Sequence, residues 1–305
     1  MNGTARLQAL GQSIWLDQIT RDLLNSGKLA RYCAEFSLTG LTSNPTIFDQ
    51  AIRNSSAYDA AIRQKAKNGI SGETLFFELA LEDLKRAAAL LKPAHDASNG
   101  MDGWVSLEIS PLLADDAAGT VREVKRLHAL AQCPNLFIKI PGTPAGAHAI
   151  EESIFAGVPV NVTLLFSREH YIAAADAYNR AIQRRIAAGL DPKINSVASL
   201  FVSRWDKAVA DKVPAGLRNR LGIAIGKRTY KTYCERALSP QWSELASAGA
   251  LPQRLLWAST GTKDPELSQT YYIEALAAPR TINTMPEKTL QALAEHAGPI
   301  SAMPE

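Results

Sequence analysis

The sequence contains little cysteine and no long apolar run. Cys33, Cys133 and Cys234 are its only cysteines, and they form no Cys-x-x-Cys motif. This spacing excludes a disulfide framework and suits a reducing compartment, so we expect a cytoplasmic protein. The longest uncharged stretch in the middle of the chain, Ser153–Ser167, is interrupted by glycine and proline and is shorter than the ~18 apolar residues of a membrane helix. Residues 1–14 contain no apolar block of signal-peptide length.

An excess of either charge is also lacking. Lys and Arg number 33 against 30 Asp and Glu, which gives a net charge of +3 without a long basic run. We therefore expect neither nucleic acid nor a membrane surface as a partner. No Gly-x-Gly-x-x-Gly follows the first predicted strand, and no Gly-x₄-Gly-Lys-[Ser/Thr] occurs anywhere, so the usual nucleotide signatures are missing. The five histidines show no metal-ligand spacing.

What the sequence does contain is an alternation of short apolar or β-branched runs with longer amphipathic stretches. Apolar residues between 77 and 91, and again between 171 and 182, follow helical spacing. Pro93 is expected to end the first of these helices and Ser167 to cap the second. The predicted strands are residues 13–17, 36–42, 103–109, 136–140, 159–165, 194–201, 254–259 and 281–283.

This alternation has no linker and no break in composition. It favours the α/β class and a single (β/α)8 barrel domain over residues 1–305. A doubly wound open sheet is the main rival, and the missing nucleotide signatures argue against it.

Polar residues stand near the C-terminal ends of these runs: Asp17, Asn44, Glu108, Lys139, Thr163, Ser199 and Ser259. In a barrel these strand ends form the catalytic face, so residues far apart in the chain would share one cleft. Successive side chains of a strand point to opposite faces. Lys139 and Glu108 are therefore expected to point into the barrel, while their apolar neighbours point toward the helices.

Lys139 is the most informative of these residues. It lies between Ile138 and Ile140, where removal of water favours the neutral amine. A neutral amine attacks ketones, and the resulting Schiff base accepts electrons during C–C cleavage. The alternative is a structural lysine paired with Glu108 or Asp17.

Several segments, in this order, resemble the transaldolases of the pentose phosphate pathway. They are Leu-Thr-Ser-Asn-Pro-Thr at 41–46, Val-Ser-Leu-Glu at 105–108, Phe-Ile-Lys-Ile-Pro-Gly-Thr at 137–143, Asn-Val-Thr-Leu-Leu-Phe-Ser at 161–167 and Ser-Leu-Phe-Val-Ser-Arg-Trp-Asp at 199–206. The resemblance runs from about residue 11 to residue 298. Residues 282–286, Ile-Asn-Thr-Met-Pro, are most similar to the subgroup that also occurs fused to a phosphoglucose isomerase.

The resemblance implies a class I Schiff-base barrel whose strands are circularly permuted relative to other class I aldolases. It implies transfer of a dihydroxyacetone unit from sedoheptulose 7-phosphate or fructose 6-phosphate to glyceraldehyde 3-phosphate or erythrose 4-phosphate, without metal or organic cofactor. Lys139 would attack the C2 ketone, and Asp17 would take the proton of the C4 hydroxyl. Glu108, with Thr163, would hold the water that moves protons.

The same resemblance implies the substrate contacts. Asn44 and Ser199 would bind hydroxyls of the retained three-carbon unit, and we also expect Asn161 and Ser259 to contact the substrate. Arg204 could present a guanidinium fork to the phosphate, the alternative being a surface arginine paired with Asp206.

Two features depart from the family pattern. Many transaldolases carry an arginine two residues after the serine equivalent to Ser259, where this chain has Gly261, so Lys263 is the expected second phosphate ligand. Members of the subgroup also continue past this chain's last residues with a helix over the barrel mouth. We expect the barrel of this sequence to lack that helix, either because the chain is short or because it is part of a longer protein. An uncovered mouth would admit water to the intermediate.

Other functions remain open on the sequence. One is a related Schiff-base aldolase with altered ketose specificity, and another is a catalytically silent barrel that binds sugar phosphates. The sequence does not indicate an oligomeric state.

Overall fold

The fold is a closed barrel of eight parallel strands in chain order. The computed structural model describes residues 1–304. Each strand pairs with the next, and the last pairs with the first. The strands are β1 (Ser13–Asp17), β2 (Leu38–Thr42), β3 (Trp104–Glu108), β4 (Leu136–Pro141), β5 (Val160–Leu165), β6 (Ser196–Phe201), β7 (Arg254–Ala258) and β8 (Ile282–Met285). The predicted barrel is confirmed, and every predicted strand lies within two residues of an observed one at each end.

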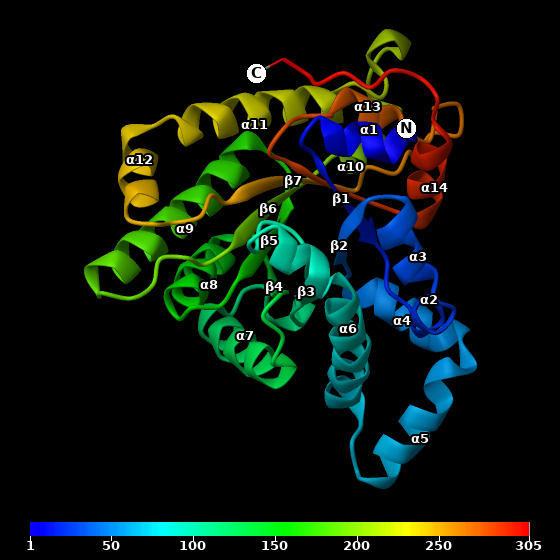
Figure 1. Cartoon of the computed structure of the whole chain (residues 1–305), viewed down its shortest axis with the longest axis vertical. Coiled ribbons are helices and arrows are strands. Elements are labelled where there is room, and N and C mark those ends of the chain that lie inside the picture. Colours follow the sequence, from blue (N-terminus) through cyan, green and yellow to red (C-terminus); the bar gives the residue numbers. More distant parts are fainter. Residues whose placement is uncertain (305) are drawn as a thin grey trace.

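Helices surround the barrel. They are α1 (Gly3–Ala9), α2 (Arg21–Asn25), α3 (Lys28–Glu35), α4 (Pro45–Asn54), α5 (Asp59–Lys67), α6 (Gly72–Ala97), α7 (Ala117–Ala131), α8 (Pro144–Phe155), α9 (Arg168–Ala187), α10 (Ser203–Val209), α11 (Leu221–Ala237), α12 (Pro240–Ser247), α13 (Tyr271–Ala275) and α14 (Glu287–Glu295). In Figure 1, α7, α8 and α9 lie on one side of the strands and α2, α3 and α4 on the other, while α5 projects away from the barrel. No helix within residues 1–304 is long and apolar enough to cross a membrane.

The two helices predicted from periodicity are present, with one correction. Ser167 caps α9 by accepting a hydrogen bond from the His170 N–H, as predicted. The prediction that Pro93 ends the other helix was wrong, because α6 continues through it to Ala97. Proline removes the hydrogen bond to the carbonyl of Ala89, and that residue is exposed, so water can bind the freed oxygen.

The apolar core forms two layers that follow the alternation along each strand. Ile138 and Ile140 belong to the outer cluster, which lies between the strands and the helices and also contains most of the buried apolar side chains of the helices. A smaller cluster fills the barrel interior with Trp15, Trp104 and Phe137, among others. The rings of Trp104 and Phe137 stack with their centroids 4.1 Å apart. The interior is therefore packed below the polar strand ends.

A glycine makes room for this aromatic layer. Gly40 pairs with Trp15 on one side and with Trp104 on the other. A Cβ atom at position 40 would lie 2.4 Å from the Trp15 ring, which is fully buried. The indole also cannot move freely, because its Nε1 donates to Asp102 Oδ1 at 2.8 Å. Only glycine fits beside these two tryptophans.

We therefore expect Gly40→Ala to lower the free energy of unfolding by about 1–3 kcal/mol, because an extra methyl group overpacks a rigid interior. Equilibrium urea denaturation measures this loss. Gly216→Ala is the matched control, since a Cβ atom at position 216 would have no neighbouring atom within 4 Å, and its effect should stay within about 0.5 kcal/mol. Equal stabilities for the two variants would contradict the packing argument.

Candidate active site

A small cavity opens at the C-terminal ends of the strands, with a volume of about 120 Å³. Most of the side chains predicted from sequence line it: Asp17, Asn44, Lys139, Ser199, Arg204, Ser259 and Lys263. Glu108, Asn161 and Thr163 lie outside this lining set. The lining residues come from β1, β2, β4, β6, β7 and β8 or from the segments that follow these strands, so closure of the barrel brings them together.

Lys139 lies on β4 with its side chain inside the barrel and is 5% exposed. Its Nζ is 3.1 Å from Glu108 Oε2 and donates a hydrogen bond to the Ser43 carbonyl oxygen at 3.0 Å. The register explains the first contact, because Glu108 on β3 is the direct cross-strand partner of Lys139. The amine thus has a carboxylate within reach for proton exchange, and Asp17 forms no ion pair with it in the described structure.

Asp17 lies at the end of β1, and side chains of the two neighbouring strands hold its carboxylate in place. The Thr42 hydroxyl donates to Asp17 Oδ1 at 3.0 Å and lies 2.6 Å from the hydroxyl of Thr284 on β8. Both threonines are 2% exposed and line the cavity. Three neighbouring strand ends therefore fix the orientation of this carboxylate.

A buried chain of polar groups runs behind the lysine. Asn161 is the cross-strand partner of Lys139 on β5, and its Nδ2 donates to Ser106 Oγ at 3.1 Å. The Ser199 hydroxyl donates to Asn161 Oδ1 at 2.7 Å, which turns the Ser199 oxygen lone pairs toward the cavity. Asn161 thus lies outside the cavity lining and contacts Ser199, which belongs to it.

Thr163 is fully buried, and its Oγ1 has no hydrogen-bond partner within residues 1–304. Such an orphaned hydroxyl is costly in a protein interior unless a water or ligand satisfies it. Its neighbour on β4 is Pro141, two residues beyond Lys139. The hydroxyl therefore belongs to the same end of the barrel as the amine.

Asn44 has two functions in the structure. Its side-chain oxygen caps α4 by accepting a hydrogen bond from the Ile47 N–H at 3.0 Å. The same residue lines the cavity, and its Nδ2 has no protein acceptor in the described part of the chain. Capping fixes the amide in place and leaves its donor group for a ligand.

Cationic side chains lie at the rim. Arg204 packs its guanidinium 5.6 Å from the centre of the Phe201 ring and forms no ion pair in the described residues. Asp206, its alternative partner, instead accepts hydrogen bonds from the Leu221 N–H and the Tyr272 hydroxyl. Arg204 is therefore available to an anion.

Lys263 is the second cation of the rim. Removal of water by the surrounding protein lowers its pKa, and the like charges of Arg204 and Lys207 lower the pKa further. Gly261, between Ser259 and Lys263, also lines the cavity. The positive charges of Arg204 and Lys263 therefore repel each other at the rim.

The main residues missed by sequence reasoning are Thr42 and Thr284. Thr42 stands in a strand where threonine is ordinary, so its contact with Asp17 has no local signal. Thr284 follows the same rule as the other polar strand ends, but the predicted strand stopped at residue 283, whereas β8 extends to Met285. No cluster of three or more His, Cys, Asp or Glu in the described residues is arranged to hold a metal ion.

A lysine that is buried in a barrel and touches a carboxylate has a group within reach that can accept its proton, as an amine nucleophile requires. The fold and this pair place the chain in the class of (β/α)8-barrel enzymes equipped for chemistry at carbonyl groups.

Comparison with known proteins identifies the family within that class. The transaldolase/fructose-6-phosphate aldolase family matches residues 14–304. A transaldolase of Thiobacillus denitrificans is 44% identical over 98% of this chain and 86% of its own length, and one of Thermobifida fusca is 44% identical over 95% and 81%. A transaldolase 2 of Nostoc sp. is 40% identical over 97% and 82%. The chain belongs to the transaldolase/fructose-6-phosphate aldolase family, while its similarity to the isomerase-fused subgroup stays a prediction.

Because its pKa is lowered, Lys263 should lose its positive charge at a lower pH than an ordinary lysine. We therefore expect anion binding at the rim to weaken as the pH rises into the alkaline range. Below this pKa the ammonium is charged and attracts an anion, and above it only Arg204 remains. Sulfate is a suitable probe because its charge is constant, and isothermal titration between about pH 7 and pH 10 measures its affinity.

Lys263→Arg is the control for this measurement, because a guanidinium stays charged throughout that range. Its affinity for sulfate should change less with pH than that of the wild type. Identical pH profiles for the two proteins would contradict a role for Lys263 at the rim.

Proposed function

We propose that this chain is a transaldolase that transfers a dihydroxyacetone unit between sugar phosphates through a Schiff base on Lys139. The observation that carries the proposal is the contact of a buried Lys139 Nζ with Glu108 Oε2 at 3.1 Å, in a lysine that faces the cavity. The donor is sedoheptulose 7-phosphate or fructose 6-phosphate, and the acceptor is glyceraldehyde 3-phosphate or erythrose 4-phosphate.

The reaction begins when the amine adds to the C2 ketone. Glu108 takes the proton that the ammonium must lose before attack. After the addition, the C2 oxygen receives this proton from Glu108 and a second one from the attached nitrogen, and it leaves as water when the iminium forms. Thr163 Oγ1, which lacks a protein partner in the described residues, is suited to bind the water that carries these protons. The Ser43 carbonyl directs the amine by accepting one of its hydrogen bonds.

Cleavage of the C3–C4 bond needs a base at the C4 hydroxyl. Asp17 takes that proton, the C4–O electrons form the aldehyde, and the electrons of the C3–C4 bond pass into the iminium to give an enamine. The aldose phosphate leaves, and the three-carbon enamine remains on Lys139 until an acceptor aldehyde arrives. Thr42, which donates to Asp17, keeps the carboxylate aimed during both half-reactions.

Neutral polar groups hold the three-carbon unit. Asn44 Nδ2 donates to one hydroxyl, and Ser199, whose own proton is engaged by Asn161, accepts from another. Ser259 lies at the cavity wall within hydrogen-bond distance of Ser203, at 3.1 Å, and contacts the sugar from the β7 side. These groups bind hydroxyls without adding charge to the enamine.

Arg204 and Lys263 bind the phosphate. A guanidinium forms two parallel hydrogen bonds with a phosphate, whereas an ammonium acts as a point charge. With glycine at position 261, Lys263 supplies the second positive charge.

The family description covers both transfer and simple aldol cleavage, and the curated relatives favour transfer, since those cited above are named transaldolases. We place the reaction in the non-oxidative pentose phosphate pathway of the cytoplasm, within one barrel domain over residues 1–305.

Borohydride reduction tests the covalent step. With fructose 6-phosphate, we expect the protein to gain a reduced three-carbon adduct on Lys139, located by peptide mass spectrometry. With erythrose 4-phosphate added, sedoheptulose 7-phosphate should appear. Lys139→Ala should lose both the adduct and the transfer, because no other amine touches Glu108 in the described structure.

Each other result of this experiment favours a different function. Release of free dihydroxyacetone instead of transfer would indicate an aldolase. An adduct of another size would indicate a different ketose, and the absence of any adduct would indicate a silent binding barrel.

The role of Asp17 predicts a separate defect. Asp17→Asn keeps the size of the side chain but removes the base, so the rate of C–C cleavage should fall roughly 10²–10⁴-fold. The Schiff base should still form, and borohydride should now trap the intact six-carbon ketose on Lys139. A three-carbon adduct formed at the wild-type rate would show that another group takes the C4 proton.

A further inference from the structure

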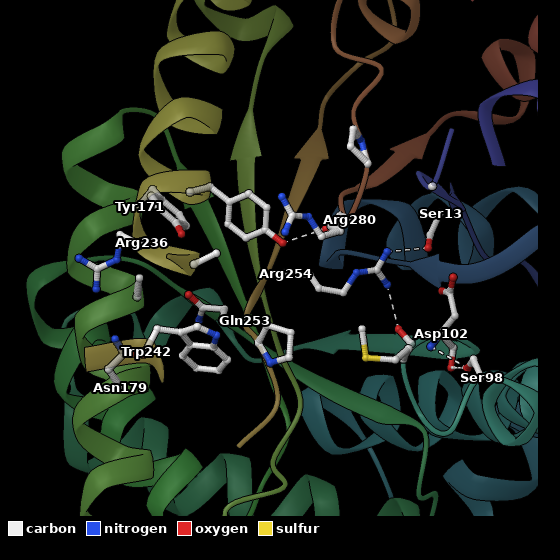
Figure 2. A pocket seen from close by; sticks show the side chains of 17 residues that line it. Ser13, Ser98, Asp102, Tyr171, Asn179, Arg236, Trp242, Gln253, Arg254 and Arg280 are labelled. Carbon is white, nitrogen blue, oxygen red and sulfur yellow. Dashed lines mark hydrogen bonds between the residues drawn. The ribbon is translucent and has the colours of Figure 1, made fainter. Parts of the chain in front are cut away.

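A second and larger cavity lies at the opposite end of the barrel, with a volume of about 490 Å³. It is bordered by the starts of β1 and β7 and by helices α9, α11 and α12 (Figure 2). Its volume is in the ~300–1,000 Å³ range of small-molecule sites. None of the residues proposed for catalysis lines it, so the transaldolase reaction does not explain it.

Arg254, the first residue of β7, contributes a buried charge to this cavity. It is 8% exposed and donates hydrogen bonds to the carbonyls of Met101 and Thr281 and to Ser13 Oγ. All these acceptors are neutral, and Arg254 forms no ion pair in residues 1–304. A guanidinium has five N–H groups, so two remain without an acceptor among the residues that the structure describes.

No carboxylate of residues 1–304 forms an ion pair with Arg254. Asp102 lines the same cavity, but its Oδ1 accepts from the Trp15 indole. Burial lowers the pKa of Arg254, and the attraction of Asp102 opposes this only in part. A buried cation without a counter-ion is unfavourable, and a bound anion would relieve that cost.

An unpaired hydrogen-bond acceptor lies on the residue next to Arg254. Gln253 is 7% exposed, and its Nε2 donates to Ser196 Oγ at 2.9 Å. Its Oε1 is buried and has no partner in the described residues. Such an acceptor fits a ligand that carries an N–H or O–H group.

The opposite wall is aromatic. Tyr171 of α9 and Trp242 of α12 are on the side away from Arg254 in Figure 2, and the Tyr233 ring of α11 also lines the space. Tyr233 is held in place because its hydroxyl donates to the Arg280 carbonyl at 2.9 Å. Trp242 is half-buried, so the cavity reaches the surface. A flat apolar group can pack against such a wall.

We propose that this cavity binds a small organic anion with a planar apolar body and at least one hydrogen-bond donor. The anionic group lies at the free N–H groups of Arg254, the planar body packs against Trp242 and Tyr233, and the donor reaches Gln253 Oε1. The cavity thus provides a ligand site on the side of the barrel opposite to the chemistry.

The dye 8-anilinonaphthalene-1-sulfonate has these three properties and is the probe. Its fluorescence should rise in a saturable one-site titration of the full chain, and the affinity should not change when fructose 6-phosphate is added to occupy the active site. The uncharged analogue N-phenyl-1-naphthylamine should bind at least about ten-fold more weakly, which corresponds to about 1.4 kcal/mol. Arg254→Met should reduce the affinity for the sulfonate to that for the neutral dye.

Ala237→Trp tests the location without removing any hydrogen bond. Ala237 lines the cavity at the end of α11, so an indole there should fill the space and weaken dye binding at least about ten-fold. Leu238→Trp is the matched control. Leu238 is 83% exposed and does not line the cavity, so this variant should bind the dye like the wild type.

Three results would overturn the proposal. Equal affinity of the wild type for both dyes would show that the negative charge of the ligand does not contribute to binding. This comparison does not depend on the folding of any variant. Displacement of the sulfonate by fructose 6-phosphate would place it in the active site. An equal loss of affinity in Ala237→Trp and Leu238→Trp would place it outside the cavity.

Discussion

The contact between Lys139 and Glu108 is the constraint on which the rest of this structure depends. An ammonium and a carboxylate inside a barrel lose their hydration, and only close pairing with further hydrogen bonds offsets that loss. The pairing follows from the register of β3 and β4, and the Ser43 carbonyl supplies the further bond from the end of β2. Three consecutive strands must therefore be in register before the amine has its proper surroundings.

The barrel separates two polar ends by an apolar middle. Trp15, Trp104 and Phe137 fill the interior, and Gly40 admits them. Above this layer the strand ends carry the groups proposed for carbonyl chemistry. Below it, Arg254 connects the start of β7 to Ser13 on β1 and to Thr281, just before β8. The two cavities share no lining residue, and none of these three aromatic residues lines either of them.

Most of the architecture could be predicted from the sequence, because the alternation of apolar runs with amphipathic stretches is a local property. The inward orientation of Lys139 and Glu108 also followed from the two-residue period. The choice between Glu108 and Asp17 as partner of the lysine could not be made in the same way, since it depends on cross-strand register.

Other features depend on contacts between distant segments. Asn44 was expected at the cleft from its place after a strand, but only the closed barrel shows that its side-chain oxygen caps α4 while its amide group is free at the cavity. The cavity around Arg254 is built from the starts of strands and from three separate helices, so no segment of the chain contains its pattern. Pro93 was misjudged because tolerance of proline in a helix depends on whether water reaches the freed carbonyl.

The pairing of β1 with β8 has a consequence for how the chain folds. One hydrogen-bonding edge of the first strand stays open until Ile282–Met285 have been synthesised, because these residues form its partner strand. An open edge can pair with other chains, and contacts between distant segments form slowly. The open edge of β1 therefore exposes the nascent chain to aggregation until this seam closes.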